Sequence, residues 1–129
     1  PHYVVGKVVE ALNECGKAVK GSKILILGLA YKADVDDIRE SPTFVLMHLL
    51  EAKGAVVDYH DPYVSEIAPT REHAEYTGRK SVDWSEETVS SYDCVLISTA
   101  HKAVDYLALA KWAPCIVDTR NVVKGAVRA

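Results

Sequence analysis

Hydrophobic and polar residues follow two different rhythms along the chain, and each rhythm predicts one kind of element. Between residues 1 and 19, apolar residues recur every three to four positions with polar residues between them, which predicts an amphipathic helix. Four later runs are short and largely apolar, which is typical of strands buried on both faces of a sheet. We expect these strands at residues 24–27, 56–59, 94–98 and 115–118.

Further helices are predicted between these strands. Ser41 followed by Pro42 is a helix start signal, and Gly54 ends the apolar segment that follows. The pattern also predicts helices at 86–91 and 103–111, an irregular polar segment at 70–80 and a short strand at 81–82. Because strands alternate with helices, we expect a three-layer, Rossmann-like α/β fold with a mostly parallel sheet.

The composition excludes several classes of partner and site. The net charge of −3 gives no reason to expect nucleic acid or an anionic membrane surface as a partner. No apolar run approaches the roughly 20 residues that span a bilayer, and no export leader is visible, so we expect a cytoplasmic protein. The chain opens with Pro1 rather than Met, which leads us to expect a piece of a longer protein. With no paired spacing among them, the three cysteines are predicted to be small buried thiols in a reducing compartment: Cys15, Cys94 and Cys115.

Cationic side chains follow the predicted strands, at the edge where ligands bind in a doubly wound sheet. Lys32 and Arg39 come after the first strand, Lys102 after the third and Arg120 after the last. Such a group could bind two phosphates, because lysine supplies a point charge and arginine a forked contact. Equally, the cations could be solvated surface charge, or could pair with the aspartates of the first loop: Asp34, Asp36 and Asp37.

Other polar residues at this edge have two possible roles each. Asp61 resembles a ribose-binding acid, but Asp-Pro is equally a plain turn, and His101 could contact a ligand or be a hydrogen-bonded loop residue. Residues 28–32 contain one glycine where a dinucleotide fingerprint needs three, so we do not expect this domain to be the main holder of a nicotinamide cofactor. No zinc-ligand spacing and no nucleophile–base pair is visible, so we expect neither a metal nor a catalytic residue.

One segment carries a family resemblance. Residues 28–42, GLAYKADVDDIRESP, resemble the signature of the C-terminal UDP-binding domain of the UDP-glucose/GDP-mannose dehydrogenase family. YHDPY at 59–63, STAH at 98–101 and VDTRN at 117–121 follow in the family's order. The resemblance covers essentially the whole chain. It implies that residues 1–20 are a connector helix from the family's central helix and that residues 21–129 are the UDP-sugar-binding domain.

The resemblance also implies an activity. Such enzymes oxidise the C6 alcohol of a nucleotide sugar to a carboxylate in two NAD-dependent steps, with a cysteine thiolate as nucleophile. The NAD fingerprint would lie in an N-terminal domain and the cysteine between the domains, both outside this chain. We therefore expect the chain alone to be inactive and the full-length enzyme to be a homo-oligomer. This domain would contribute binding energy from parts of the substrate that do not react.

Site residues follow from the same resemblance. Lys32 would reach the UDP-sugar near its reacting end, and Arg120 would hold the substrate or its pyrophosphate. Arg39 would point across the cleft toward the NAD, with Asp36 and Asp37 bracing it.

The identity of the sugar depends on a single position. Val35, before the paired aspartates, is similar to the branch of the family that acts on UDP-N-acetylhexosamines. We therefore favour UDP-N-acetylglucosamine or its mannosamine epimer, with UDP-glucose as the alternative. Two other classes stay open: a stand-alone nucleotide-binding or regulatory module, and a scaffold whose cations are all surface charge.

Overall fold

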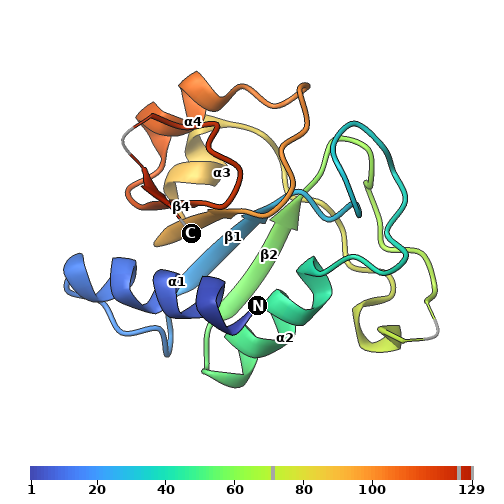
Figure 1. The fold of residues 1–129 in the computed structure, drawn as a ribbon, viewed down its shortest axis with the longest axis horizontal. Helices are drawn as coiled ribbons and strands as arrows, with labels where there is room; N and C mark the ends of the chain where they lie inside the picture. The colour runs from blue at the N-terminus through green and yellow to red at the C-terminus, as the bar shows by residue number, and fades with distance from the viewer. Residues whose placement is uncertain (71, 125, 129) are drawn as a thin grey trace.

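A parallel sheet forms the centre of the fold. The computed structural model describes residues 1–70, 72–124 and 126–128, and five parallel strands lie in the order β2-β1-β3-β4-β5 (Figure 1). Their bounds are Lys23–Leu27 (β1), Val56–His60 (β2), Cys94–Ile97 (β3), Ile116–Asp118 (β4) and Val127–Arg128 (β5). Helices cover both faces, which confirms the predicted three-layer α/β fold.

Alternate residues of the central strands point to opposite faces and build two cores. On one face, Ile24 and Ile26 of β1 belong to a cluster with α1 (His2–Glu14) and α2 (Thr43–Ala52). On the other face, Leu25 and Leu27 belong to a cluster with α3 (Glu86–Ser90) and α4 (Tyr106–Trp112). Because β1 and β3 are buried on both sides, their apolar runs are continuous and could be read from the sequence.

Helix α1 packs into the first core and ends earlier than predicted. Its buried residues recur at helical spacing: Val5, Val8, Ala11 and Leu12. The prediction extended the helix to residue 19, but it ends at Glu14 because Gly16 takes a left-handed φ of 75°. The N–H groups of Gly16 and Lys17 then donate to the carbonyls of Asn13 and Leu12, which is a Schellman turn.

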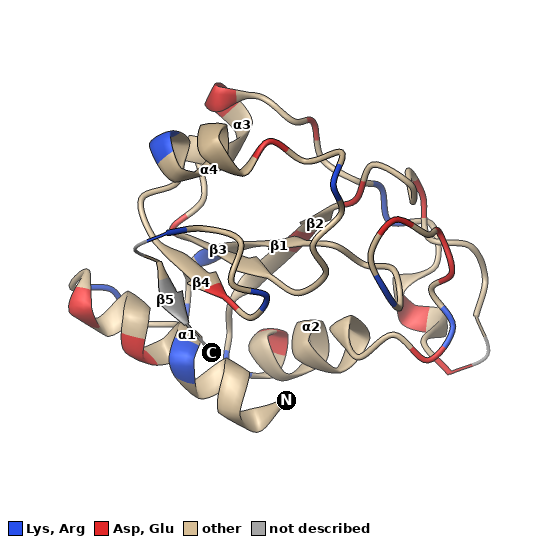
Figure 2. Cartoon of the chain, turned by 45° about the horizontal axis from the view of Figure 1, so that its top comes forward, with Lys and Arg blue, Asp and Glu red and all other residues tan. Residues whose placement is uncertain are grey.

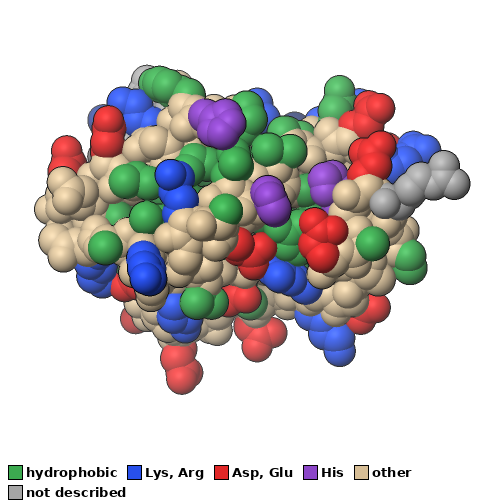
Figure 3. Space-filling model, turned by 90° about the horizontal axis from the view of Figure 1, so that it is seen from below, with side chains coloured by type: hydrophobic (Ala, Val, Ile, Leu, Met, Phe, Trp, Pro, Cys, Tyr) green, Lys and Arg blue, Asp and Glu red, His purple; other side chains and the backbone are tan. Residues whose placement is uncertain are grey.

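Helix α2 begins and ends where the sequence indicates. Pro42 already has helical dihedrals, and the Oγ of Ser41 accepts a hydrogen bond from the Thr43 N–H at 3.3 Å. After Ala52 the chain turns at Gly54, whose φ of 91° closes a second Schellman turn. Seen from the α1–α2 side, hydrophobic side chains lie among charged residues and histidines (Figure 3). Tyr3 of α1 and Val45 of α2 are exposed apolar residues.

The structure corrects the predicted elements on the other face. Helix α4 was predicted from residue 103 but begins at Tyr106, because the Oδ1 of Asp105 accepts hydrogen bonds from the N–H groups of Leu107 and Ala108. The predicted strand at 81–82 is not a strand, although an isolated antiparallel bridge joins residues 66 and 80 beside it. Strand β5 was not predicted, because a two-residue strand leaves no periodicity.

The predicted irregular polar segment at 70–80 contributes a buried aromatic side chain to the first core. It contains a short 3-10 helix, η1 (Ala74–Tyr76), which was not predicted. The ring of Tyr76 is buried and stacks on Phe44 of α2, and its hydroxyl donates a hydrogen bond to Glu51. This contact joins the segment to the first core.

Of the three cysteines, two confirm the sequence prediction. Cys94 and Cys115 are buried, whereas Cys15 is exposed at the end of α1, where the predicted helix would have continued. Hydrogen bonding from the Cys94 and Cys15 thiols lowers the pKa of Cys115. Within residues 1–70, 72–124 and 126–128, no helix is long and apolar enough to cross a membrane, and no cluster of side chains could hold a metal ion.

Candidate functional site

The loops after β1, β2, β3 and β4 form one edge of the sheet, which we call the carboxyl edge (residues 28–42, 61–63, 98–105 and 119–123). The strand order reverses between β1 and β3, and ligands of open α/β sheets bind at such a switch point. Here the two loops touch: a Cβ on Gly28 would lie 2.2 Å from the carbonyl oxygen of Thr99, and the φ of Gly28 is 88°. Only glycine fits this position.

Asp61 joins the end of β2 to the end of β1. Its Oδ2 accepts hydrogen bonds from the N–H groups of Leu29 (2.8 Å) and Ala30 (3.0 Å), and its Oδ1 accepts one from the Tyr63 N–H (2.8 Å). The carboxylate is completely buried. The bond to Tyr63 is the Asx-turn geometry expected of Asp-Pro, so the geometry favours the turn over a ribose-binding acid.

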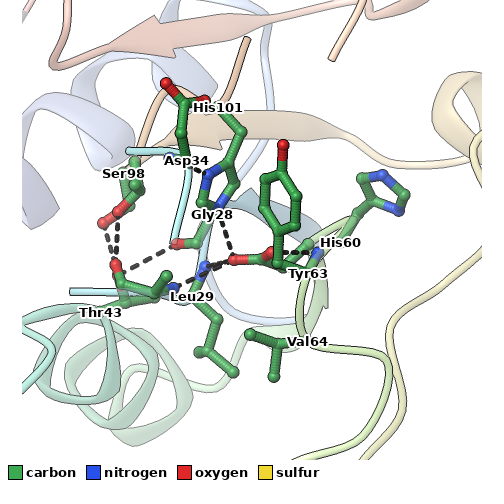
Figure 4. Close-up of polar contacts among 12 residues, drawn as sticks. Gly28, Leu29, Asp34, Thr43, His60, Tyr63, Val64, Ser98 and His101 are labelled. Atoms are coloured by element: carbon green, nitrogen blue, oxygen red, sulfur yellow. Dashed lines mark hydrogen bonds and ion pairs between the residues drawn. The ribbon is translucent and has the colours of Figure 1, made fainter. Parts of the chain in front are cut away.

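His101 is the fourth partner of this carboxylate. Its imidazole is completely buried and lies 2.8 Å from the Oδ2 of Asp61 through Nε2 (Figure 4). On the other side of the ring, Nδ1 accepts a hydrogen bond from the Asp34 N–H at 2.8 Å. Both ring nitrogens are thus occupied by protein groups, which favours a hydrogen-bonded loop histidine over a ligand contact.

The loop that carries Lys32 is held in an unusual backbone conformation. Asp34 and Glu40 have φ values of 63° and 57°, in the left-handed region that non-glycine residues rarely adopt. The Tyr31 N–H donates to the Asp37 carbonyl at 2.6 Å. Lys32 itself is exposed, so its ammonium group is available to an anion. This loop between β1 and α2 carries both basic and acidic residues, with the acidic ones in the majority (Figure 2).

Arg39 forms a two-pronged ion pair within the same loop. Its Nε and Nη2 donate to the two carboxylate oxygens of Asp37 at 3.0 and 2.9 Å. The guanidinium group holds the pKa of Asp37 at about 2. Asp37 therefore braces Arg39 as the resemblance implied. The side chain of Arg39 is 85% exposed and borders two surface hollows. Tyr31, Asp37 and Glu40 line the first hollow. The second is lined by Ile38, Glu40 and residues 69–70 and 72–73.

Arg120 lies in the loop after β4, which is built around a second buried carboxylate. Asp118 accepts hydrogen bonds from the N–H groups of Arg120, Val122 and Val123 at 2.7–2.8 Å. The Nε of Arg120 donates to the Ser98 carbonyl at 2.9 Å, and among the described residues the terminal nitrogens of its guanidinium group have no hydrogen-bond partner. Asn121 follows in a left-handed conformation with φ of 59°.

A series of hydrogen bonds connects Arg120 to the loop of Lys32. Ser98, which accepts from Arg120, shares a 2.6 Å hydrogen bond between its Oγ and the Oγ1 of Thr43. The same Oγ1 donates to the Gly28 carbonyl at 3.2 Å (Figure 4). The structure thus places Lys32, Arg39 and Arg120 on adjoining loops of one edge.

The residues at the end of β1 do not fit a dinucleotide. In a dinucleotide-binding domain, the N–H groups after the first strand and at the following helix receive the pyrophosphate. Here the Leu29 and Ala30 N–H groups are taken by the carboxylate of Asp61, and α2 begins only after a loop that extends to Pro42. A nicotinamide cofactor therefore lacks its usual cradle in this domain.

Comparison with known proteins identifies the family. The family described as "UDP-glucose/GDP-mannose dehydrogenase family, UDP binding domain" matches residues 25–125. The chain belongs to this family. Among relatives of the UDP-binding domain, a UDP-N-acetyl-D-mannosamine dehydrogenase of Pyrococcus horikoshii is 30% identical and a UDP-glucose 6-dehydrogenase of Rickettsia bellii is 32% identical. Each alignment covers 96% of this chain but only 28% and 29% of the relative, so the chain spans under a third of their length.

Solved structures of the family have the same fold as this UDP-binding domain. The UDP-D-ManNAc dehydrogenase of P. horikoshii superposes with a TM-score of 0.75 at 28% identity, covering 99% of this chain and 29% of that one. The NDP-N-acetyl-D-galactosaminuronic acid dehydrogenase of Methanosarcina mazei gives 0.76 at 30% identity, covering 100% and 28%.

Sequence reasoning missed the pairing of Asp61 with His101 in this UDP-binding domain. Each residue was noted separately, at the end of a different strand. The available signal was position: both follow strands of one parallel sheet, at the edge where their polar side chains can meet. Nothing in the spacing of 40 positions shows that the two are partners.

Proposed function

We propose that this chain recognises the UDP part of a UDP-sugar within an NAD-dependent nucleotide-sugar 6-dehydrogenase, which oxidises the C6 alcohol to a carboxylate. Membership of the family supports the class of substrate. The observation that carries the proposal is the arrangement of Lys32 and Arg120. They extend from adjoining loops at the switch point. The backbone N–H groups that would otherwise bind phosphate already donate to the Asp61 carboxylate, so the phosphates would be bound by these two side chains instead.

The proposed roles follow from what each cation can donate. Lys32, exposed on its loop, supplies a point charge to the UDP-sugar near its reacting end. Arg120, anchored through Nε, has its terminal nitrogens left to form a forked contact with the pyrophosphate. Arg39 serves the cofactor side, because its exposed guanidinium group is already oriented by Asp37.

The rest of the enzyme is part of the proposal. NAD would be held mainly by an N-terminal domain, because the end of β1 lacks a cradle for its pyrophosphate. The catalytic thiol would lie between the two domains, outside this chain, so the chain alone would be inactive. We further propose that residues 1–20 connect the two domains, that the full-length enzyme is a cytoplasmic homo-oligomer, and that Asp36 helps to shape the Arg39 loop.

For the sugar, we propose a UDP-N-acetylhexosamine. The relatives include dehydrogenases named for UDP-N-acetyl-D-mannosamine and others named for UDP-glucose, at similar identity. The proposal therefore depends on Val35, which is half-buried in the loop and need not touch the sugar to affect how that loop packs. Specificity constants of the full-length enzyme on UDP-N-acetylglucosamine, UDP-N-acetylmannosamine and UDP-glucose test it directly.

Calorimetric titration of the chain with UDP tests the binding function. We expect weak binding that becomes weaker as salt rises, because part of the site is supplied by the missing domain. Lys32→Ala and Arg120→Ala should each reduce the affinity roughly tenfold, as expected for a charge-assisted hydrogen bond. Lys53 is an exposed lysine at the end of α2, so Lys53→Ala is the matched control and should leave the UDP affinity unchanged. Equal affinities for Lys32→Ala and Lys53→Ala would remove Lys32 from the site.

A further inference from the structure

His101 joins two loops that are far apart in the sequence, and one of them carries Lys32. We propose that His101 is a positioning residue that fixes the Lys32 loop for UDP binding, and that it does so as a neutral imidazole protonated at Nε2. This inference rests on the proposed UDP-binding function. It assigns no direct ligand contact to His101, whose ring is completely buried.

The hydrogen bonds determine the tautomer. A backbone N–H can only donate, so the 2.8 Å contact between the Asp34 N–H and Nδ1 requires a free lone pair on Nδ1. The proton of the neutral ring must then be on Nε2, where it is donated to the Oδ2 of Asp61 at 2.8 Å. That oxygen also accepts from two backbone N–H groups, so it is held as an acceptor.

The Asp34–His101 contact constrains the backbone on one side of Lys32. Asp34 is left-handed, with φ of 63°, a conformation that needs support from its surroundings. Two hydrogen bonds provide it: the Asp34 N–H donates to His101, and the Oδ1 of Asp34 accepts from the Lys102 N–H at 2.8 Å. On the other side of Lys32, the Tyr31 N–H is bonded to the Asp37 carbonyl. Lys32 is therefore fixed from both directions although its side chain is exposed.

The surroundings of the ring favour support over ligand contact. The Tyr63 ring packs edge-on against the imidazole, with centroids 4.8 Å apart and planes at 75°. The Tyr106 hydroxyl donates to the His101 carbonyl at 2.9 Å. With tyrosines at the ring and at the backbone, and with both nitrogens bonded, the orientation of His101 is fully determined.

Two substitutions test the Nε2 and Nδ1 hydrogen bonds of His101 separately. His101→Gln places an amide NH2 near the Nε2 position, so the bond to Asp61 is kept while the acceptor for the Asp34 N–H is lost. His101→Asn places a carbonyl oxygen near the Nδ1 position, so the Asp34 bond is kept while the donor to Asp61 is lost. Tyr92→Phe is the control: it removes a hydrogen bond to Asp58 in a part of the fold away from the carboxyl edge.

We expect the two variants to lose different properties. In His101→Gln, the Asp34 amide should exchange with solvent roughly tenfold faster and UDP affinity should fall about three- to tenfold, as expected for one lost hydrogen bond. In His101→Asn, stability should fall further than in His101→Gln, but the Asp34 amide should stay protected and most of the UDP affinity should be retained. Tyr92→Phe should lose stability with no change in UDP affinity.

If His101 only stabilised the fold, the loss of UDP affinity would be proportional to the loss of stability in all three variants. That result would overturn the proposal. Nitrogen-15 NMR of the wild-type imidazole gives a test that needs no variant: a proton on Nδ1 would also overturn it, and an Nε2–H tautomer supports it. If the wild-type chain bound no UDP, both the proposed function and this inference would fail. Unchanged Asp34 exchange in a folded His101→Gln variant that still binds UDP would instead reject His101 alone.

Discussion

The two edges of the sheet use different residues for the same backbone conformation. At the amino edge, where helices lead into strands, the left-handed positions of the described residues are glycines: Gly16, Gly21 and Gly54. At the carboxyl edge Gly28 is also left-handed, but it is joined by three non-glycine residues: Asp34, Glu40 and Asn121. A non-glycine residue in this region costs on the order of 1 kcal/mol or more and persists only where its surroundings hold it. Backbone strain is thus concentrated at the edge where we propose that UDP binds.

The hydrogen bonds that close the turns differ in the same way. At the amino edge, the two Schellman turns are closed by hydrogen bonds between backbone groups a few residues apart, as between Gly16 and Asn13. At the carboxyl edge, the buried carboxylate of Asp61 joins backbone groups far away in the sequence, such as the Leu29 N–H. A change at the Gly16 turn should therefore have a local effect, whereas a change at the carboxyl edge should affect several loops together.

Substitution of Gly28 is the most damaging test of this difference. In Gly28→Ala the new Cβ would meet the Thr99 backbone at 2.2 Å, and the left-handed φ adds strain. We expect a loss of at least about 4 kcal/mol in the free energy of unfolding, which few small domains survive. Gly16→Ala is the matched control, because its Cβ would enter open space at a similar φ. It should cost only about 1–2 kcal/mol, and equal losses in urea unfolding would contradict the comparison.

Replacement of Asp61 should have the next largest effect. Asp61→Asn leaves one acceptor oxygen and turns an NH2 group toward buried N–H donors, so we expect a loss of roughly 2–4 kcal/mol. Asp58→Asn is the control, since the retained carbonyl oxygen can still accept from the Tyr92 hydroxyl, and it should cost under about 1 kcal/mol. Thermal and denaturant unfolding measure both. If Asp61→Asn lowered the free energy of unfolding no more than Asp58→Asn, this carboxylate would not hold the carboxyl edge together.

The exposed ion pair of Arg39 gives the smallest effect. Because the guanidinium group holds the pKa of Asp37 at about 2, below that of an unfolded chain, the pair stabilises the loop above about pH 4 and is lost as the pH falls toward 2. Carbon-13 NMR of the Asp37 carboxyl group should show this low pKa in the wild type and an ordinary one in Arg39→Ala. An ordinary pKa in both proteins would mean that the pair does not form in solution.

The same contrast explains what the sequence could predict. The apolar runs of β1 and β3, the start of α2 at Ser41 and its end at Gly54 are local patterns, and the structure confirms them. The end of α1 at Gly16 was also local, but the apolar spacing continued past it and concealed the turn. The cations could be placed at one edge because parallel strands all end there. The distant partners of the Asp61 carboxylate, by contrast, come from two other segments, at Leu29 and His101, and depend on the tertiary fold.

Mapping of UDP onto the chain by NMR tests the central claim most directly. When the nitrogen-15-labelled chain is titrated with UDP, the amide shifts should change at the carboxyl edge, in residues 28–42, 98–105 and 119–123. The amides of Gly16 and Gly54 at the amino edge should not move, and added salt should weaken the response. Shift changes centred on the amino edge, or none at either edge at millimolar UDP, would contradict the account.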